Sequence, residues 1–175
     1  TIKTYIDNWY RNNMIEYTEY LEDAVWCNDR SIYQLNSWDK DYIGIDDLYF
    51  GAYGRISEPY TPSTVCPNPV DSFTVSSENG NGKLTYPVAL LTIDEINMAG
   101  GISIFAHNCY LYTDEDWWSL SPNFFSDFDA NEFIVRSYGG LGYDNVFFMR
   151  GVRPSIALAH DLIVAKGEGT STSPY

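Results

Sequence analysis

Apolar side chains recur along the start of the chain at the spacing of an amphipathic helix. They are Ile2, Tyr5, Ile6, Trp9 and Tyr10. The same spacing continues from Met14 to Leu21, after a break near Asn12 and Asn13. The pattern therefore predicts one or two helices at the start of the chain.

A second helix is predicted in the middle of the chain, where a start signal and a stop signal frame a short apolar period. Thr92 can accept a hydrogen bond from the amide of Glu95, whose side chain can reach back to the amide of Thr92. Gly100 and Gly101 are typical of a helix end. We therefore expect a capped helix that begins after Thr92 and ends before the glycines.

The remaining segments predict strands and loops. Glycine and proline interrupt residues 39–72 so often that long irregular loops are expected there. SFTVSS, ENGNGK and LTYPVALLT have the pattern of strand, turn and strand. Further strands are predicted at GISIFA, CYLYT, WWSLSP, EFIVRS, DNVFF, VRPSIALA and DLIVA. Early helices, one internal helix and many short strands indicate an α+β fold with long loops.

Length and composition describe a folded chain that does not bind nucleic acid. The 175 residues fit one ordinary domain, and an aromatic share of 17% is far too high for a disordered segment. A net charge of -14 repels nucleic acid and anionic membranes. No apolar run is long enough to insert directly into a bilayer. Because the chain begins at Thr1 with a helical pattern, we expect it to be part of a longer, surface-anchored protein.

Cysteine placement adds a prediction about the compartment. Cys27 and Cys66 both lie beside turn-forming residues, so we expect a disulfide between them that closes a long loop. Cys109 would then be unpaired. Three reduced thiols in a cytosolic protein are the alternative, and the disulfide would instead indicate an extracellular protein.

Several motifs together resemble a group of bacterial surface-protein domains. The residues that carry the resemblance are CNDRS, YFGAYGR, YPVALLTIDEINMAGG, YLYTDEDWWSLSPN, GVRPSIALAHDLIV and GEGTSTSPY. The group is similar to the C-type-lectin-like fold in its formylglycine-generating-enzyme branch. This resemblance covers residues 24–175 and implies a C-type-lectin-like domain there, with residues 1–23 as a helical segment packed on it.

The chemistry of the related families is not carried over to this chain. Formylglycine-generating enzymes hold copper with a late pair of cysteines, and no cysteine follows Cys109. Sugar-binding C-type lectins use calcium motifs that this chain lacks, and Asp129 and Asn131 lie in a run that departs from an EF-hand at its glycine and glutamate positions. His107 and His160 lie far apart in sequence. We therefore predict no catalytic residue, no metal and no cofactor.

Large side chains of mixed polarity gather in the late part of the chain instead. We predict that they form a ligand-binding surface: Phe124, Phe125, Asp127, Arg136, Tyr138, Tyr143, Asn145, Phe147, Met149 and Arg150. Tyrosine, phenylalanine, methionine and arginine dominate binding hot spots because they give much contact area per ordered side chain. In the variable proteins of diversity-generating retroelements, which share the fold that the chain resembles, the matching region is an antibody-like surface. Packing of these aromatics under residues 39–72 is the alternative.

The function that follows is non-enzymatic recognition at a bacterial or phage-encoded surface. The partner would be a protein or glycan on another cell or host, contacted through aromatic side chains, with Arg136 and Arg150 donating hydrogen bonds and the Gly139–Gly140 turn shaping the hairpin. Two alternatives stay open. One is an enzyme of the formylglycine-generating class with a rebuilt polar cleft around His107 and Cys109, and the other is a purely structural pilus or wall module.

The late strands also supply predicted core residues. They are Val135, Leu141, Val146, Val152, Ile156 and Leu158.

Overall fold

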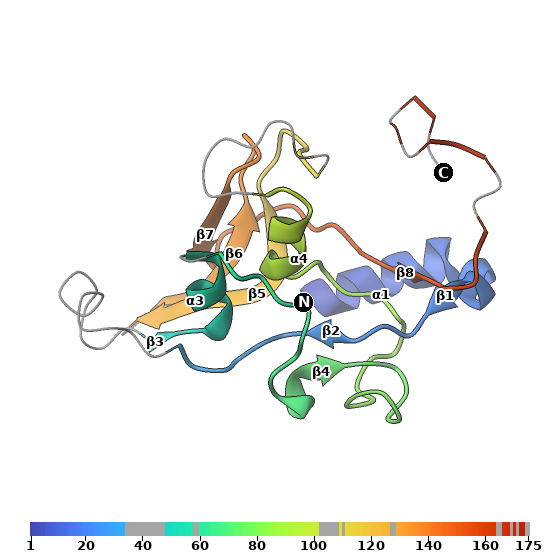
Figure 1. Cartoon of the computed structure of the whole chain (residues 1–175), viewed down its shortest axis with the longest axis horizontal. Helices are drawn as coiled ribbons and strands as arrows, with labels where there is room; N and C mark the ends of the chain where they lie inside the picture. The colour runs from blue at the N-terminus through green and yellow to red at the C-terminus, as the bar shows by residue number, and fades with distance from the viewer. Residues whose placement is uncertain are drawn as a thin grey trace.

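The computed structural model shows an α+β fold in which small antiparallel sheets lie between short helices (Figure 1). It describes residues 1–33, 48–57, 60–101, 109, 111–126, 129–163, 166–168, 170 and 172–173. Helix α1 (Ile2–Asn13) begins at Thr1, whose hydroxyl accepts from the Thr4 amide, and a 3-10 helix, η1 (Ile15–Tyr20), follows. The break predicted near Asn12 and Asn13 is confirmed. In the described part of the chain, no helix has the length and apolar character needed to cross a membrane.

The largest sheet has four strands in the order β3-β5-β6-β7, and all its pairings are antiparallel. These strands are β3 (Leu48–Tyr49), β5 (Trp117–Ser126), β6 (Asp129–Val135) and β7 (Leu141–Asn145). The other strands form two two-stranded antiparallel sheets. In one, β1 (Leu21–Glu22) pairs with β8 (Ala157–Leu158), and in the other β2 (Trp26–Cys27) pairs with β4 (Ser72–Phe73). The strands predicted at WWSLSP and EFIVRS are confirmed, and DNVFF contributes only its first two residues to β7.

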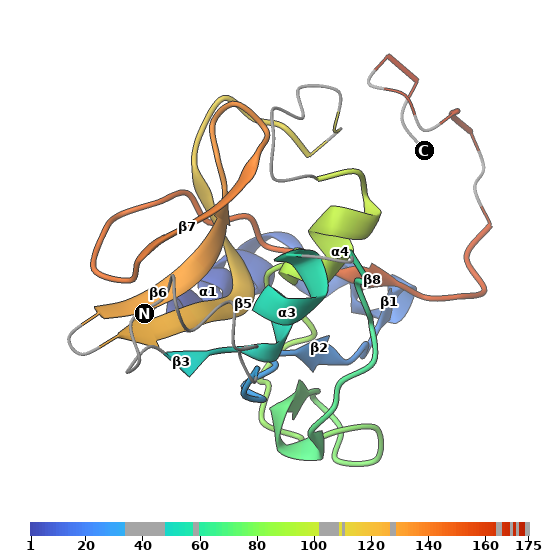
Figure 2. The same ribbon diagram turned by 60° about the vertical axis from the view of Figure 1, so that its left-hand side comes forward.

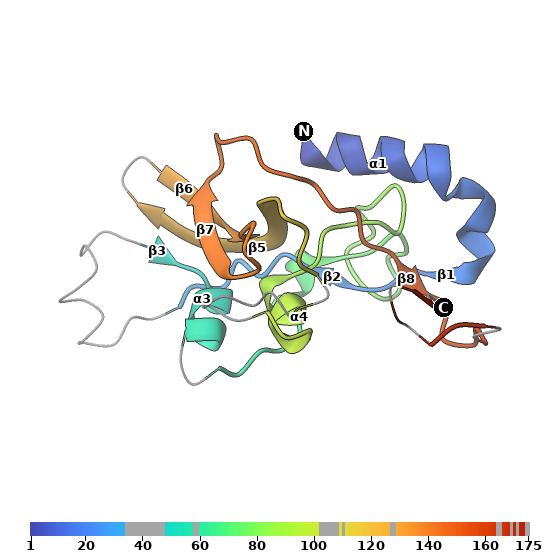
Figure 3. The same ribbon diagram turned by 90° about the horizontal axis from the view of Figure 1, so that it is seen from above.

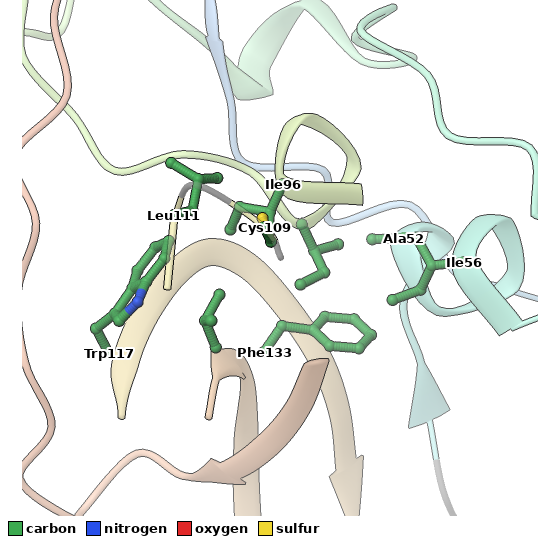
Figure 4. Packing of buried hydrophobic residues seen from close by; sticks show 9 residues of the cluster. Ala52, Ile56, Ile96, Cys109, Leu111, Trp117 and Phe133 are labelled. Carbon is green, nitrogen blue, oxygen red and sulfur yellow. The ribbon is translucent and has the colours of Figure 1, made fainter. Parts of the chain in front are cut away.

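The adjacent tryptophans of β5 show that both faces of this sheet are covered. Trp117 is buried on the face that packs against α3 (Gly51–Ser57) and α4 (Ile93–Met98), together with Phe133 (Figure 4). Trp118 is buried on the other face, where it packs with Ile6 and Tyr10 of α1. Figure 3 shows α1 on one side of the molecule and α3 with α4 on the other.

Local signals placed helix α4 correctly. Thr92 and Glu95 form both hydrogen bonds of the predicted capping box, and Gly100 follows the helix with a φ of 95°. The disulfide between Cys27 and Cys66 is also confirmed, with the two Cα atoms 5.5 Å apart. Cys109 is unpaired, as predicted, and the structure shows in addition that it is buried.

Other predicted elements are wrong or only partly formed. Residues 72–92 form no hairpin, because β4 pairs with β2 and the later residues make only an isolated bridge from Ala89 to Ser155. The segment 39–72 contains helix α3 and a 3-10 turn, η2 (Pro69–Asp71), in its described part. Residues 152–159 form only the two-residue strand β8, and the described residues of CYLYT and DLIVA form no strand. GISIFA lies mostly outside the described residues. Val146 and Leu158, predicted as core, are exposed.

A buried ion network ties the helical side of the fold together. Arg55 of α3 donates to Asp94 of α4 through Nε at 2.7 Å and to Asp29 through Nη1 at 2.7 Å. Asp94 also accepts from the amide of Ser63, three residues before the disulfide at Cys66. This network joins segments that are distant in sequence.

Candidate functional site

The hairpin of β6 and β7 turns at the predicted double glycine. The amide of Gly139 donates to the carbonyl of Arg136 at 2.8 Å, and the amide of Arg136 donates to the carbonyl of Gly140 at 2.8 Å. Gly139 has a φ of 84°, a conformation that glycine adopts without strain. A Cβ atom at Gly140 would overlap the Tyr138 ring. The turn therefore requires glycine at position 139, and a side chain at position 140 would have to displace the exposed Tyr138 ring.

A loop of consecutive apolar side chains follows β7, and we call residues Val146–Met149 the tip loop. All four side chains are exposed, with Phe147 at 71% and Met149 at 93%. The rings of Phe147 and Phe148 lie 4.3 Å apart between centroids. Runs of exposed apolar residues are unfavourable in water and mark interaction sites when they persist. The tip loop is the centre of the candidate site.

Hydrogen bonds fix both ends of the tip loop. At its start the amide of Val146 donates to the carbonyl of Ala130 at 3.0 Å. Asn145 then accepts twice, from the Phe147 amide at its side chain and from the Phe148 amide at its carbonyl. After the loop, the Gly151 amide donates to the Asp116 carbonyl at 2.8 Å, and the Trp118 amide donates to the Gly151 carbonyl at 3.0 Å. The exposed side chains therefore project from a fixed backbone.

A surface ion network supports the base of this loop. Arg150 donates to Asp144 through Nε at 2.8 Å, and its guanidinium lies 5.4 Å from the Phe148 ring centroid. Arg136 donates to Asp116 at 3.3 Å and to the carbonyl of Tyr143 at 2.8 Å. The two arginines predicted to contact a ligand are thus already engaged with carboxylates of the chain itself. Their geometry orients the loop.

Phe124 packs against other aromatic rings instead of facing a partner. Its ring stacks on Tyr49 at 5.2 Å and meets Tyr143 edge-on at 5.1 Å, and Tyr49 in turn contacts Tyr53 of α3. This aromatic row is half-buried beneath α3, so the alternative of packing is correct for Phe124. Tyr143 ends the row with half of its side chain exposed.

The predicted site residues therefore fall into distinct groups. The exposed ones are Phe125, Tyr138, Tyr143, Phe147 and Met149. Arg136, Asn145 and Arg150 hold the loop, Phe124 packs, and Asp127 lies outside the described residues. Sequence reasoning missed Asp116 and Asp144 and assigned Val146 to the core. The signal it could have used is an uninterrupted VFFM run between Asp144 and Arg150, which are oppositely charged.

An acidic depression borders the tip loop. Asp114, Glu115 and Asp116 line it together with Met149 and Arg150. Asp114 adopts a φ of 62°, which is uncommon outside glycine. Asp116 is paired with Arg136 and Arg150, and Asp114 accepts from the Tyr112 hydroxyl. Glu115 is therefore the carboxylate available to a basic group of a partner that contacts Met149.

The other candidate chemistry does not assemble in the described part of the chain. Cys109 donates to the Ala99 carbonyl at 3.5 Å and is buried in an apolar cluster, while His107 lies outside the described residues. Asp129–Asn131 is extended strand, a backbone that no EF-hand loop adopts. Within the described residues, no group of three His, Cys, Asp or Glu side chains is placed to hold a metal ion. Arg153 donates to the Leu111 carbonyl at 2.6 Å and lies over the Trp117 ring, so it has a structural role.

Comparison with protein-family models, curated proteins and solved structures gave no match for this chain. The function is therefore inferred from the site geometry described above.

Proposed function

We propose that this chain is a non-enzymatic recognition domain of a bacterial or phage-encoded surface protein, and that the tip loop contacts the partner. One observation carries the proposal: four consecutive apolar side chains, Val146 to Met149, are exposed on a loop whose two ends are fixed. Fixing a binding loop before association lowers the conformational entropy lost on binding. Tyr138 and Tyr143, both exposed, extend the surface beside it.

A protein partner fits this surface better than a glycan. Valine, phenylalanine and methionine side chains bind by burial of apolar area, which a protein surface supplies more readily than a sugar. Asp116 is already paired with Arg136 and Arg150, and Asp114 accepts from the Tyr112 hydroxyl. Glu115 is the carboxylate of this depression that favours a basic group beside the apolar contact. The proposed partner is thus a surface protein of another cell or host with an apolar patch next to lysine or arginine.

The proposed location and fold agree with the position of the tip loop. The disulfide is compatible with an extracellular protein. Strands β1 and β8 pair the early and late parts of the domain, and Figure 2 shows them on the opposite side of the molecule from the segment after β7. A C-type-lectin-like domain anchored near β1 and β8 would present the tip loop outward.

A matched pair of double variants tests the proposal. Phe147→Ser with Met149→Ser should reduce binding of the labelled domain to partner cells more than tenfold, because both hot-spot side chains are lost. Val65→Ser with Ile163→Ser removes equally exposed apolar side chains elsewhere and should bind like the unaltered chain. Melting curves should coincide for all these proteins. Equal binding by both double variants would contradict the proposal.

The natural variation of the gene supplies a second test. Sequences from several isolates should concentrate their differences in residues 124–150 if this surface is diversified, as in the variable proteins that the chain resembles. An even spread of differences would favour the structural-module alternative.

A further inference from the structure

A cavity lies on the α1 face of the sheet, and Val146 at the start of the tip loop lines part of it. Its volume is about 370 Å³, within the range of small-molecule pockets. Side chains from α1, residues 83–90 and strands β2, β4, β5 and β6 form its walls, and they are mainly apolar. The exposed residues Ile2 and Lys83 also line it, so the cavity reaches the surface.

One ionisable group of this cavity has no partner. Glu132 of β6 points to the same face as Ile134, because alternate residues of a strand share a face. Its side chain lines the cavity, and no described residue donates a hydrogen bond to it. Burial raises the pKa of Glu132 to about 7. The Glu132 side chain is half-buried, and a carboxyl group in a mainly apolar wall is unfavourable when no donor accompanies it.

We propose that this cavity binds a primary amine with an aromatic or branched apolar body, and that the ammonium group pairs with the Glu132 carboxylate. An ammonium group supplies the donors that the carboxylate lacks, and charge-assisted hydrogen bonds of this kind are the strong ones. Trp26, Phe73, Trp118 and Leu120 offer apolar walls for the body of the ligand.

The other charges near the cavity permit a cationic ligand. Lys3 also lines it, but its ammonium forms an ion pair with Asp7 on the next turn of α1. Lys83 is exposed, so water screens its charge. The net charge of -14 attracts cations to the chain as a whole.

Calorimetric titration of the 175-residue chain at pH 8 tests the proposal with three probes of similar shape. They are 2-phenylethylamine, 2-phenylethanol and 3-phenylpropionate. The amine should bind at least about tenfold more tightly than the alcohol, because only the amine forms a charge-assisted hydrogen bond. The carboxylate should bind most weakly, since it repels Glu132.

Variants identify the group responsible. Glu132→Gln should remove the preference for the amine and leave binding of the alcohol unchanged, whereas the exposed Glu78→Gln should behave like the unaltered chain. Leu84→Trp, which fills the cavity, should abolish binding of the amine and the alcohol. The Phe147→Ser and Met149→Ser double variant should bind the amine normally, because neither side chain lines the cavity.

Three results would overturn the proposal. They are equal affinity for amine and alcohol, an amine preference that survives in Glu132→Gln, and no binding of any probe to the unaltered chain. Melting curves of each variant show whether lost binding reflects lost folding, and Glu132→Gln should melt no lower than the unaltered chain at pH 8.

Discussion

Arg55 and Arg150 each lie between two aspartates, in different parts of the molecule. The carboxylates around Arg55, Asp29 and Asp94, are only 4% and 3% exposed. Those around Arg150, Asp116 and Asp144, are 22% and 14% exposed. The inner network joins helices and loops of the core, whereas the outer one supports an exposed loop.

The difference in burial decides what each network contributes. Burial opposes ionisation of Asp29, yet hydrogen bonds from Ser31 and Arg55 outweigh it and lower its pKa. Removing Arg55 would leave two buried carboxylates without their cation, which is a large penalty. The outer carboxylates can turn to water when their arginine is removed, so the outer network contributes mainly orientation.

The largest expected effect is the loss of Arg55. Arg55→Met should lower the free energy of unfolding by about 3–5 kcal/mol, because Asp29 and Asp94 would remain buried without their cation. Urea denaturation at pH 7 measures this, with Arg11→Met on the exposed face of α1 as the control. A loss below about 1 kcal/mol would mean that the inner network stabilises the fold no more than a surface ion pair does.

Removal of the disulfide should cause the second-largest loss of stability, because the disulfide tethers the segment whose Ser63 amide donates to Asp94. Replacing both Cys27 and Cys66 with serine should cost about 2–4 kcal/mol. Thermal melting of this variant, and of the unaltered chain with and without reductant, gives the value. An effect of reductant on the double-serine variant would point to another cause, since only buried Cys109 remains in it.

Glu132 extends the comparison, because it is a half-buried acid that has no cation as a partner among the described residues. Its raised pKa means that the folded chain holds a proton that the unfolded chain releases, so stability should fall as pH rises from about 4.5 to about 7. The contribution is at most about 3 kcal/mol. Glu132→Gln should flatten this part of the stability profile, and Glu78→Gln should not. A profile unchanged in Glu132→Gln would show that the carboxyl is solvated.

The smallest expected change in stability is at the outer network. Arg150→Met should alter the free energy of unfolding by less than about 1 kcal/mol. It should nevertheless weaken partner binding, because the tip loop would lose the contacts of Arg150 with Asp144 and the Phe148 ring. Cell-binding titrations and urea denaturation of the same preparation measure both effects. Unchanged binding would show that the loop is held by its backbone alone.

Features with a short-range cause could be predicted from the sequence. The capping box of Thr92 and Glu95 depends on residues three apart, and the break after α1 depends on its own asparagines. Strands β5 and β6 were also predicted, and they pair with each other as consecutive strands of the chain. The exposed side chains of Phe147 and Met149 were predicted from composition and position alone.

Features set by distant partners could not be predicted. Gly51 and Gly54 suggested a loop, but they lie in helix α3, where a Cβ at Gly54 would overlap the Tyr33 ring. Residues 152–159 have a strand pattern, yet they pair only where Ala89 and β1 happen to lie beside them. The roles of Arg136 and Arg150 depended on Asp116, which reaches them only through the fold.

The backbone bonds on either side of the tip loop have a consequence for engineering. Ala130 and Asp116, which anchor the loop, use main-chain atoms, so their grip does not depend on which side chains lie between them. The side chains at positions 146–149 could therefore be randomised to make a library of variants. Most of these variants should keep the fold, and variants that bind a chosen new target protein could be selected from the library.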